Sequence, residues 1–352
     1  MLSMRITRAP LSPEENEVIL GEYNRLTGAK IPLHEFVHWV QNSPEGPAWH
    51  AILETDDGRI VGHTSVFPLR TEYGERRLIP AKSEYSFLHE DFRREKIRGY
   101  ETVSRPAFII LLDALFKHCQ DFGWGPIFAS TNEKNQVFTR KVGLRPIEFP
   151  LWECLLVLRP GRAARETPNL TKWQRAGLFA AGVAQRTLWR IATLVLPSAN
   201  GIKNVAIEQE GVKPEQHKFS FFEDAASLGW RYFDGQYLRF GFEQSTADHL
   251  LAKRGSPSGY LRVCQWRLES TDSIFPILTS LVHEARRERA LGVRWAVYDG
   301  DAAAEGLVKE MRRAGFLCVR RKRTVMIHKK DEQFLDPSLW RINDSLFSFD
   351  PS

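Results

Sequence analysis

Residues 121–149 read DFGWGPIFASTNEKNQVFTRKVGLRPIEF and follow an order of elements that returns later in the chain. A glycine-containing turn leads into a short apolar strand at Pro126–Ser130, and a polar loop and a helix at about Glu133–Lys141 follow. A glycine next to a large apolar residue then precedes a strand around Leu151–Leu158. Residues 290–319, ALGVRWAVYDGDAAAEGLVKEMRRAGFLCV, run through the same order. This self-similarity indicates one α/β unit used twice.

The chain before this stretch predicts helices and then an antiparallel meander. Helical and alternating spacing give helices at Glu14–Leu26 and Leu33–Gln41 and strands at Trp49–Glu54, Ile60–Leu69 and Arg77–Leu88. Asp56-Asp57-Gly58 is a hairpin turn between the first two strands. After Pro106, apolar residues from Phe108 to Phe122 recur at i, i+3, i+4 and i+7, which predicts an amphipathic helix.

The second half predicts a similar set of elements. These are strands at Ala247–Lys253, Gly259–Trp266, Val293–Tyr298 and Arg323–His328 and helices around Phe275–Ala285 and Ala302–Ala314. The expected fold class is α/β (α+β), with two tandem domains that each have a mixed central sheet flanked by helices. We expect a first domain at 1–158, a linker at 159–203, a second domain at 204–335 and a tail at 336–352.

Composition narrows the possible functions of the 352 residues. The 49 Lys and Arg exceed the 43 Asp and Glu by only 6, too few for a charge-driven nucleic-acid binder, and a local anionic ligand is the better expectation. The cysteines (Cys119, Cys154, Cys264 and Cys318) have no paired spacing, so we expect neither a metal site nor a disulfide framework. With no secretory signal at the N-terminus, this favours the reducing cytoplasm.

Residues 173–196, WQRAGLFAAGVAQRTLWRIATLVL, predict an amphipathic helix in the linker. Three arginines interrupt the apolar run, so we expect no transmembrane span. The apolar residues expected on one side are Leu178, Val183, Leu188, Ile191 and Leu194. Packing of that side on a domain is the favoured interpretation, and contact with a membrane surface is the alternative.

Between the third strand of the meander and the following helix lies the basic segment HEDFRREKIRGYETVS, residues 89–104. It gathers four cations and a glycine: Arg93, Arg94, Lys96, Arg98 and Gly99. Backbone N–H groups near a helix start attract phosphate, and glycine lets the backbone approach it closely. The segment therefore predicts a diphosphate site, with a solvated basic turn as the alternative.

The strand, basic turn, helix and strand, followed by Asn132 and Gly143-Leu144, resemble the GNAT superfamily of acyl-CoA-dependent N-acyltransferases. In that family an Arg/Gln-x-x-Gly-x-Gly/Ala loop holds the pyrophosphate of coenzyme A. Residues 94–99 fit this loop with Ile97 in place of the first glycine, and a second register aligns 88–93 with the run that precedes it. The resemblance implies acetyl-CoA or another short acyl-CoA as co-substrate. The second half has no such turn at 266–272, so we expect one acyl-CoA site, in the first half.

The resemblance also implies an acceptor and a set of site residues. The segments 228–232, 315–316 and 340–344 look like tandem GNAT proteins of bacterial surface-polysaccharide pathways, which implies a small-molecule amine such as a nucleotide-linked amino sugar. Many relatives carry a tyrosine general acid where this chain has Thr139, so the expected proton donor to the leaving thiolate is Thr139 or water. Phe138 beside it is an expected cofactor-binding residue. Asn132 is expected either to bind the pantetheine arm or to cap the following helix.

Amide formation needs a base for the amine and donors for the developing oxyanion. Backbone N–H groups near Phe87, Leu88 and His89 are the expected donors. Glu84 is the first choice of base because strict alternation places it on the strand face shared by Ser86 and Leu88. His89 is the second choice of base and His63 a weaker one.

These observations favour direct acyl transfer in a ternary complex, since no cysteine lies on the strand to carry the acyl group. Two alternatives remain. A Fem-type aminoacyl transferase uses the same duplicated fold with aminoacyl-tRNA as donor. A non-catalytic module would bind CoA or another ligand without turnover.

Overall fold

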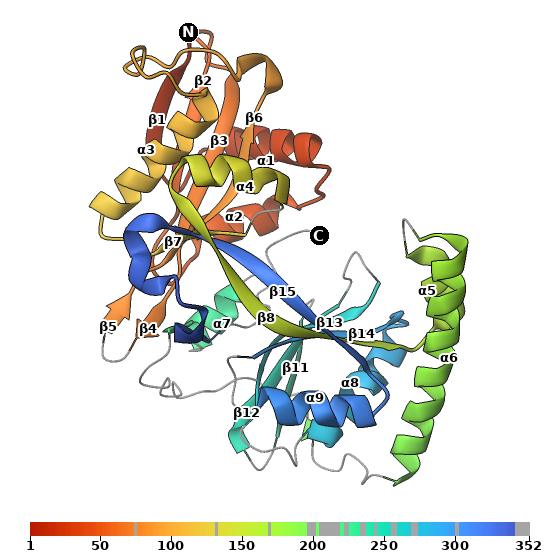
Figure 1. Cartoon of the computed structure of the whole chain (residues 1–352). Helices are drawn as coiled ribbons and strands as arrows, with labels where there is room; N and C mark the ends of the chain where they lie inside the picture. Colours follow the sequence, from red (N-terminus) through yellow and green to blue (C-terminus); the bar gives the residue numbers. More distant parts are fainter. Residues whose placement is uncertain are drawn as a thin grey trace.

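The computed structural model describes residues 1–73, 76–130, 133–167, 170–195, 202–203, 219–221, 225–232, 237–242, 245–254, 259–268, 274–299 and 303–341. Twelve of the described strands form one continuous sheet in the order β1-β2-β3-β6-β7-β15-β8-β14-β13-β12-β11-β9. In the first half helices cover both faces of this sheet, and in the second half they lie on one face and along its side (Figure 1). The expected mixed α/β fold of two tandem domains, each built on a sheet flanked by helices, is confirmed.

The first half begins with a strand and two helices, a meander follows, and a strand–helix–strand–helix–strand order ends it. The elements are β1 (Ser3–Arg8), α1 (Pro13–Thr27), α2 (Leu33–Gln41), β2 (Trp49–Glu54), β3 (Ile60–Pro68), β4 (Thr71–Tyr73), β5 (Arg76–Leu78), β6 (Ala81–Leu88), η1 (Glu90–Phe92), α3 (Ala107–Asp121), β7 (Ile127–Ala129), α4 (Glu133–Lys141) and β8 (Leu144–Val157). From α1 onward their order follows the one expected from the sequence, whereas β1, β4 and η1 were not predicted, nor was β5 as a separate strand.

Local chemistry sets the ends of α1. Ser12 accepts from the backbone N–H of Glu15 while the Glu15 carboxylate accepts from the N–H of Ser12, and this capping box starts the helix ahead of Pro13. The helix stops at Gly28, whose φ of +74° is a left-handed conformation that glycine adopts without strain.

The second half begins with two helices beside the sheet. The elements are α5 (Pro160–Glu166), α6 (Lys172–Val195), β9 (Ile202–Lys203), β10 (Phe219–Phe221), α7 (Ala225–Arg231), β11 (Tyr237–Phe242), β12 (Ser245–Lys253), β13 (Leu261–Arg267), α8 (Ile274–Arg287), β14 (Gly292–Tyr298), α9 (Ala304–Arg313), β15 (Leu317–His328), η3 (Lys329–Phe334), η4 (Pro337–Leu339) and β16 (Trp340–Arg341). None of the helices that the structure describes is both long and apolar enough to cross a membrane.

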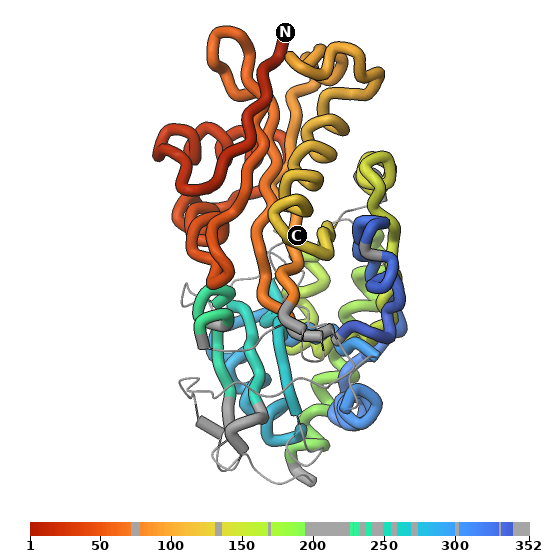
Figure 2. The backbone as a smooth tube through the Cα atoms, turned by 90° about the vertical axis from the view of Figure 1, so that its left-hand side faces the viewer, coloured from red at the N-terminus to blue at the C-terminus, as the bar shows by residue number. Residues whose placement is uncertain are grey.

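Two long strands join the halves. β8 and β15 pair antiparallel over their whole common length, from Leu144 opposite His328 to Leu155 opposite Leu317. The end of β15 also pairs with β7 in the first half, and the end of β8 also pairs with β14 in the second half. The end of β15 therefore belongs to the sheet of the first half, and the end of β8 belongs to the sheet of the second half. The two long strands cross between the halves (Figure 1). Seen from the side, the halves stack end to end (Figure 2).

Three strand predictions from the sequence were wrong in extent. The expected strand Arg77–Leu88 is two strands, because β5 pairs with β4 in a separate small sheet while β6 joins the main sheet. The strands expected from Leu151 and from Arg323 begin earlier, at Leu144 and Leu317. Their additional residues are in strand conformation because β8 and β15 pair with each other. No pattern of residues close in sequence predicts that pairing.

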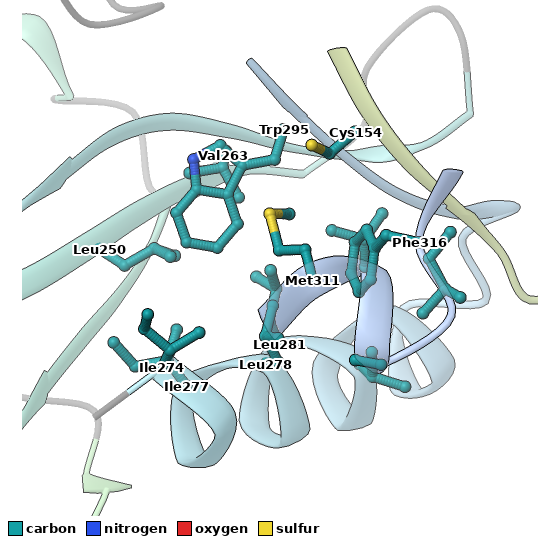
Figure 3. Packing of buried hydrophobic residues seen from close by; sticks show 14 of the residues in the cluster. Cys154, Leu250, Val263, Ile274, Ile277, Leu278, Leu281, Trp295, Met311 and Phe316 are labelled. Atoms are coloured by element: carbon teal, nitrogen blue, oxygen red, sulfur yellow. The ribbon is translucent and has the colours of Figure 1, made fainter. Parts of the chain in front are cut away.

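Hydrophobic clusters lie on both faces of the sheet. In the first half, α1 and α2 cover one face and α3 covers the other. In the second half, α8 and α9 pack on β13 and β14 around Trp295, Leu278 and Met311 (Figure 3). Trp340, only 2% exposed, belongs to the cluster of the first half and ties the end of the described chain to it.

Candidate functional site

β6 and β7 are parallel neighbours that part after two residues. Ala81 pairs with Ile127 and Lys82 with Phe128, whereas β6 continues to Leu88. Among the described residues, no strand pairs with β6 beyond Lys82 on the side of β7, and we call this unpaired stretch of the sheet the gap. β13 and β14 of the second half also pair at only three positions, so both halves keep this parting.

A bulge interrupts β6 beside the gap. Glu84 pairs with Ser65 and Phe87 with His63, so Tyr85 and Ser86 together oppose Thr64. Tyr85 takes up the bend with a φ of +52°, an uncommon conformation for a bulky residue.

The bulge corrects one expectation about Glu84. Ser65 and His63 lie on one face of β3, which places Glu84 on the face of Phe87. Ser86 lies on the opposite face, where its Oγ is 2.7 Å from Oγ1 of Thr64. Strict alternation along β6 was therefore the wrong assumption, because the extra residue reverses the faces.

Two buried histidines, His63 and His50, form a hydrogen-bonded chain that ends at the bulge. Nδ1 of His63 lies 2.8 Å from the carbonyl oxygen of Tyr85, and Nε2 of His63 lies 2.9 Å from Nδ1 of His50. Burial lowers the pKa of His63 to about 4 and the pKa of His50 well below its usual range. Both rings are therefore neutral near neutral pH, and His63 holds the backbone instead of facing the gap as a base.

The charged pair of β6 lies on the same face as Phe87. Lys82 is fully buried and its ammonium forms an ion pair with the carboxylate of Glu84, whose side chain is 11% exposed. A carboxylate on the strand beside the gap is a group that can accept a proton from an amine. Glu84 thus stays the first candidate for the base.

The backbone supplies one donor that faces the gap. The N–H of His89 donates to the carbonyl oxygen of Val61 in β3. Because alternate residues of an antiparallel strand direct their N–H groups to opposite edges, the N–H of Leu88 points toward the gap. Of the expected donors at Phe87, Leu88 and His89, the geometry therefore favours Leu88.

The side chain of His89 contacts α1. Its Nε2 lies 3.2 Å from a carboxylate oxygen of Glu22, and its Nδ1 lies 3.5 Å from a guanidinium nitrogen of Arg25. The ring is 6% exposed and fills the contact between α1 and the end of β6. This arrangement accounts for His89 as a residue that packs between α1 and the end of β6.

Residues 93–99 of the basic segment form a bend between η1 and α3. This bend lies against the ends of the meander. The backbone of Lys96 and Arg98 hydrogen-bonds to Leu2, and the side chain of Ile97 is fully buried with residues of α3. Arg98 pairs with Asp56 at 3.2 Å, and Arg93 pairs with Glu90 at 2.7 Å. Ile97 therefore anchors the bend through packing, and no direct contact of its side chain with a ligand is available.

The remaining groups of the bend are oriented for an anion. Gly99 has a φ of +82°, and its N–H donates at 2.9 Å to the carboxylate of Glu101. This bond and the nearby cations Arg98 and Lys96 lower the pKa of Glu101. Arg94 and Lys96 are exposed. The Gly99 N–H therefore already donates to an anionic oxygen, that of the Glu101 carboxylate.

The three expected site residues near α4 differ in what the structure shows. The hydroxyl of Thr139 is buried and donates to the carbonyl oxygen of Gln136, so its proton is held within the helix. Phe138 is 43% exposed and packs edge-to-face on Phe108 of α3. Asn132 lies outside the described residues, as does most of the segment 266–272 expected to lack a phosphate cradle.

Sequence reasoning missed Lys82, Tyr85 and His50. A lysine inside an otherwise buried strand was a usable signal for Lys82, because such a cation needs a partner. The hairpin turn at 56–58 brings His50 near His63 once the register is known. No feature of the sequence pointed to Tyr85, because the position of a β-bulge depends on how two strands pair. Among the described residues, no group of three or more His, Cys, Asp or Glu could hold a metal ion.

No protein-family model matches the chain, and no curated protein matches its sequence. The chain is similar to the solved structure of a conserved protein from Enterococcus faecalis V583, a probable N-acyltransferase, with 8% identity, a TM-score of 0.54 and coverage of 93% of this chain and 73% of that one. A GCN5-related N-acetyltransferase from Anabaena variabilis shows 12% identity, a TM-score of 0.54 and coverage of 92% and 72%.

A tandem GNAT protein of the clavulanic acid pathway also matches, with 11% identity and coverage of 92% of this chain and 98% of that one. Its TM-score of 0.46 is too low to support an argument. The first two likenesses show that the chain has the fold of the GCN5-related N-acetyltransferases. At these identities, the activity has to be argued from the chain's own residues.

Proposed function

We propose that the chain is an acyl-CoA-dependent N-acyltransferase whose donor site is the gap between β6 and β7. The observation that carries this proposal is the parting of the two strands directly beside the bulge. An unpaired strand edge binds an extended amide-containing chain through backbone hydrogen bonds. The pantetheine arm of coenzyme A is such a chain, and its thioester would then lie near Leu88.

The residues at the gap support direct transfer. Glu84 takes the proton of the acceptor amine, and the amine nitrogen attacks the thioester carbonyl carbon. The N–H of Leu88 donates to the oxygen that becomes negative in the tetrahedral intermediate. The intermediate collapses to an amide, and the C–S bond breaks to release the CoA thiolate, which takes a proton from water.

The bend at 93–99 is proposed to hold the diphosphate of the donor. Arg94 and Lys96 supply exposed cations, and the N–H of Gly99 supplies a backbone donor once the Glu101 carboxylate turns away. The other two cations of the bend already pair with Glu90 and Asp56. The acyl group is proposed to be acetyl or another short chain.

For the acceptor we propose a small-molecule amine, with nucleotide-linked amino sugars as the first compounds to test. This finer part rests on the segments 228–232, 315–316 and 340–344, which look like tandem GNAT proteins of surface-polysaccharide pathways. Residues 342–344 of the last segment lie outside the described residues.

The test combines binding and turnover on the full chain. Thermal shift with acetyl-CoA, with longer acyl-CoAs and with free CoA measures donor binding, and thiol release with a panel of amines and amino-sugar nucleotides measures transfer. We expect stabilisation by acetyl-CoA and thiol release that depends on the amine. Stabilisation without thiol release with any amine would favour a binding module, and transfer only from aminoacyl-tRNA would favour a Fem-type enzyme.

A further inference from the structure

Helix α6 runs along the outer side of the second half, with one side turned away from the rest of the molecule (Figure 1). Its exposed side carries large apolar side chains at unusually high exposure. These are Trp173 at 87%, Phe179 at 49%, Val183 at 45%, Leu188 at 50% and Ile191 at 54%. Scattered exposed apolar residues are ordinary, but α6 carries five large ones between Trp173 and Ile191, and these define its exposed apolar side.

This outward orientation reverses the expectation from sequence, in which Val183, Leu188 and Ile191 belong to the packed side. The side that packs is made instead by Gly182, Gln185, Trp189 and Ala192. Trp189 is 1% exposed and stacks on Phe275 of α8.

Specific contacts fix the rotation of the helix. The side chain of Gln185 bonds to the backbone of β8, accepting from Val157 N–H at 3.0 Å and donating to Leu155 O at 2.9 Å. A Cβ added to Gly182 would lie 2.8 Å from Pro160, so the helix approaches α5 too closely to rotate. The apolar residues therefore cannot turn inward without breaking these contacts.

The charged residues of α6 itself all have one sign. By the spacing of 3.6 residues per turn, Lys172, Arg186 and Arg190 follow one border of the exposed apolar side. The sequence of α6 contains no Asp or Glu. Burial and the charges of Arg186 and Arg190 lower the pKa of Arg286 in α8.

We propose that α6 is an interfacial helix that binds this protein to the surface of a membrane containing anionic phospholipids. The five apolar side chains enter the boundary between headgroups and acyl chains, and Arg186 and Arg190 contact the lipid phosphates. A second copy of the chain is a poorer occupant, because pairing two α6 helices would bring their cationic borders together without any carboxylate on either helix. The proposal rests on α6 alone and is independent of the proposed catalysis.

Sedimentation of the full chain with vesicles tests the proposal. We expect binding to vesicles of equal parts phosphatidylglycerol and phosphatidylcholine, and much weaker binding to phosphatidylcholine alone. Replacing Val183→Gln and Ile191→Gln together is expected to weaken binding roughly tenfold or more. Replacing Arg186→Gln and Arg190→Gln is expected to weaken it about fivefold for each cation.

Matched controls come from valines that are equally exposed on other helices. Val18→Gln in α1 and Val137→Gln in α4, at 45% and 56% exposure, should leave vesicle binding unchanged. Failure of the wild-type chain to bind anionic vesicles would overturn the proposal, as would equal effects of the control and α6 variants. A dimer in analytical ultracentrifugation that Val183→Gln and Ile191→Gln dissociate, without vesicle binding, would assign the surface to a second copy instead.

Discussion

Nδ1 of His63 lies 2.8 Å from the carbonyl oxygen of Tyr85, the residue that forms the bulge of β6. A carbonyl oxygen only accepts, so Nδ1 of His63 carries the proton and its Nε2 accepts from Nδ1 of His50. The two neutral rings form a short buried chain that fixes the bulge, and the bulge sets which groups face the gap. Charging His63 would break this order, because a proton on its Nε2 removes the acceptor for Nδ1 of His50.

Stability is expected to fall on acidification because of these histidines. The pKa of His63 is about 4 in the folded chain and near 6.5 when unfolded. The unfolded chain therefore binds the additional proton in this window, and the free energy of unfolding drops by roughly 3 kcal/mol as pH falls from about 6.5 to about 4. His50 contributes in the same direction. Urea unfolding at several pH values measures the slope.

The control for this prediction is His63→Gln, which removes the titrating ring but keeps a donor. Its stability should be lower near neutral pH and should depend less on pH across the window than that of the wild type. An identical slope in both proteins would show that other groups cause the acid sensitivity.

Glu84→Gln is expected to lower kcat by about 10²–10⁴-fold, because the base is lost. Acetyl-CoA binding should change little. The variant also leaves the buried Lys82 ammonium without its carboxylate, so its stability should fall. Adding Lys82→Met is expected to restore stability but not turnover, measured by urea unfolding and thiol release. Recovery of turnover in the double variant would mean that Glu84 serves only to neutralise Lys82.

Glu101→Gln is expected to tighten coenzyme A binding several-fold. The carboxylate that accepts from the Gly99 N–H competes with a phosphate oxygen for the same donor, and the amide removes its charge. Isothermal titration with free CoA measures the change. Glu95→Gln, another exposed carboxylate of the bend, controls for the general loss of negative charge. Equal tightening in both variants would contradict a specific role of Glu101.

Arg94→Gln and Lys96→Gln are each expected to weaken acetyl-CoA binding about fivefold to tenfold, since a charge-assisted contact to phosphate is lost. S-acetyl-pantetheine has no diphosphate and should react equally well with the variants and the wild type. Comparing kcat/KM for the two donors separates a phosphate contact from a general disturbance. Equal losses with both donors would place the diphosphate elsewhere.

Cys154 and Cys318 are far apart in the sequence but lie directly opposite each other on β8 and β15, both as free thiols. Directly opposite residues of antiparallel strands fall within the Cα separation of a disulfide. The neighbouring Cys318 sulfur and burial both raise the pKa of Cys154, which slows its oxidation. Diamide is expected to link the pair slowly, with the loss of two hydrogens seen by mass spectrometry. The loss should be absent in Cys318→Ser.

Much of the first half was predictable because its patterns are local. The capping box at Ser12 and Glu15, the hairpin turn at 56–58 and the apolar spacing after Pro106 each involve residues close in sequence. α2 and α4 were predicted with the bounds that the structure shows. Glu84 was found as a candidate base because it lies on a recognisable strand next to the basic bend.

The parts that escaped prediction depend on distant pairing. The long arms of β8 and β15, the bulge at Tyr85 and the pairing of Ile97 with Leu2 all require partners many residues away. The rotation of α6 is another example, since a polar Gln185 packs inward through bonds to β8 while Ile191 stays outside. A hydrophobic pattern alone cannot reveal either outcome.

The sequence by itself determined most of the first half's order of elements and the repetition of one α/β unit, because turns, caps and periodicity act over a few residues. Only the tertiary structure decided which face of β6 carries Glu84, which backbone N–H meets the gap and which side of α6 stays exposed. The physical reason is that each of these depends on hydrogen bonds and packing between segments far apart in the chain, and their register is fixed only when the whole sheet assembles.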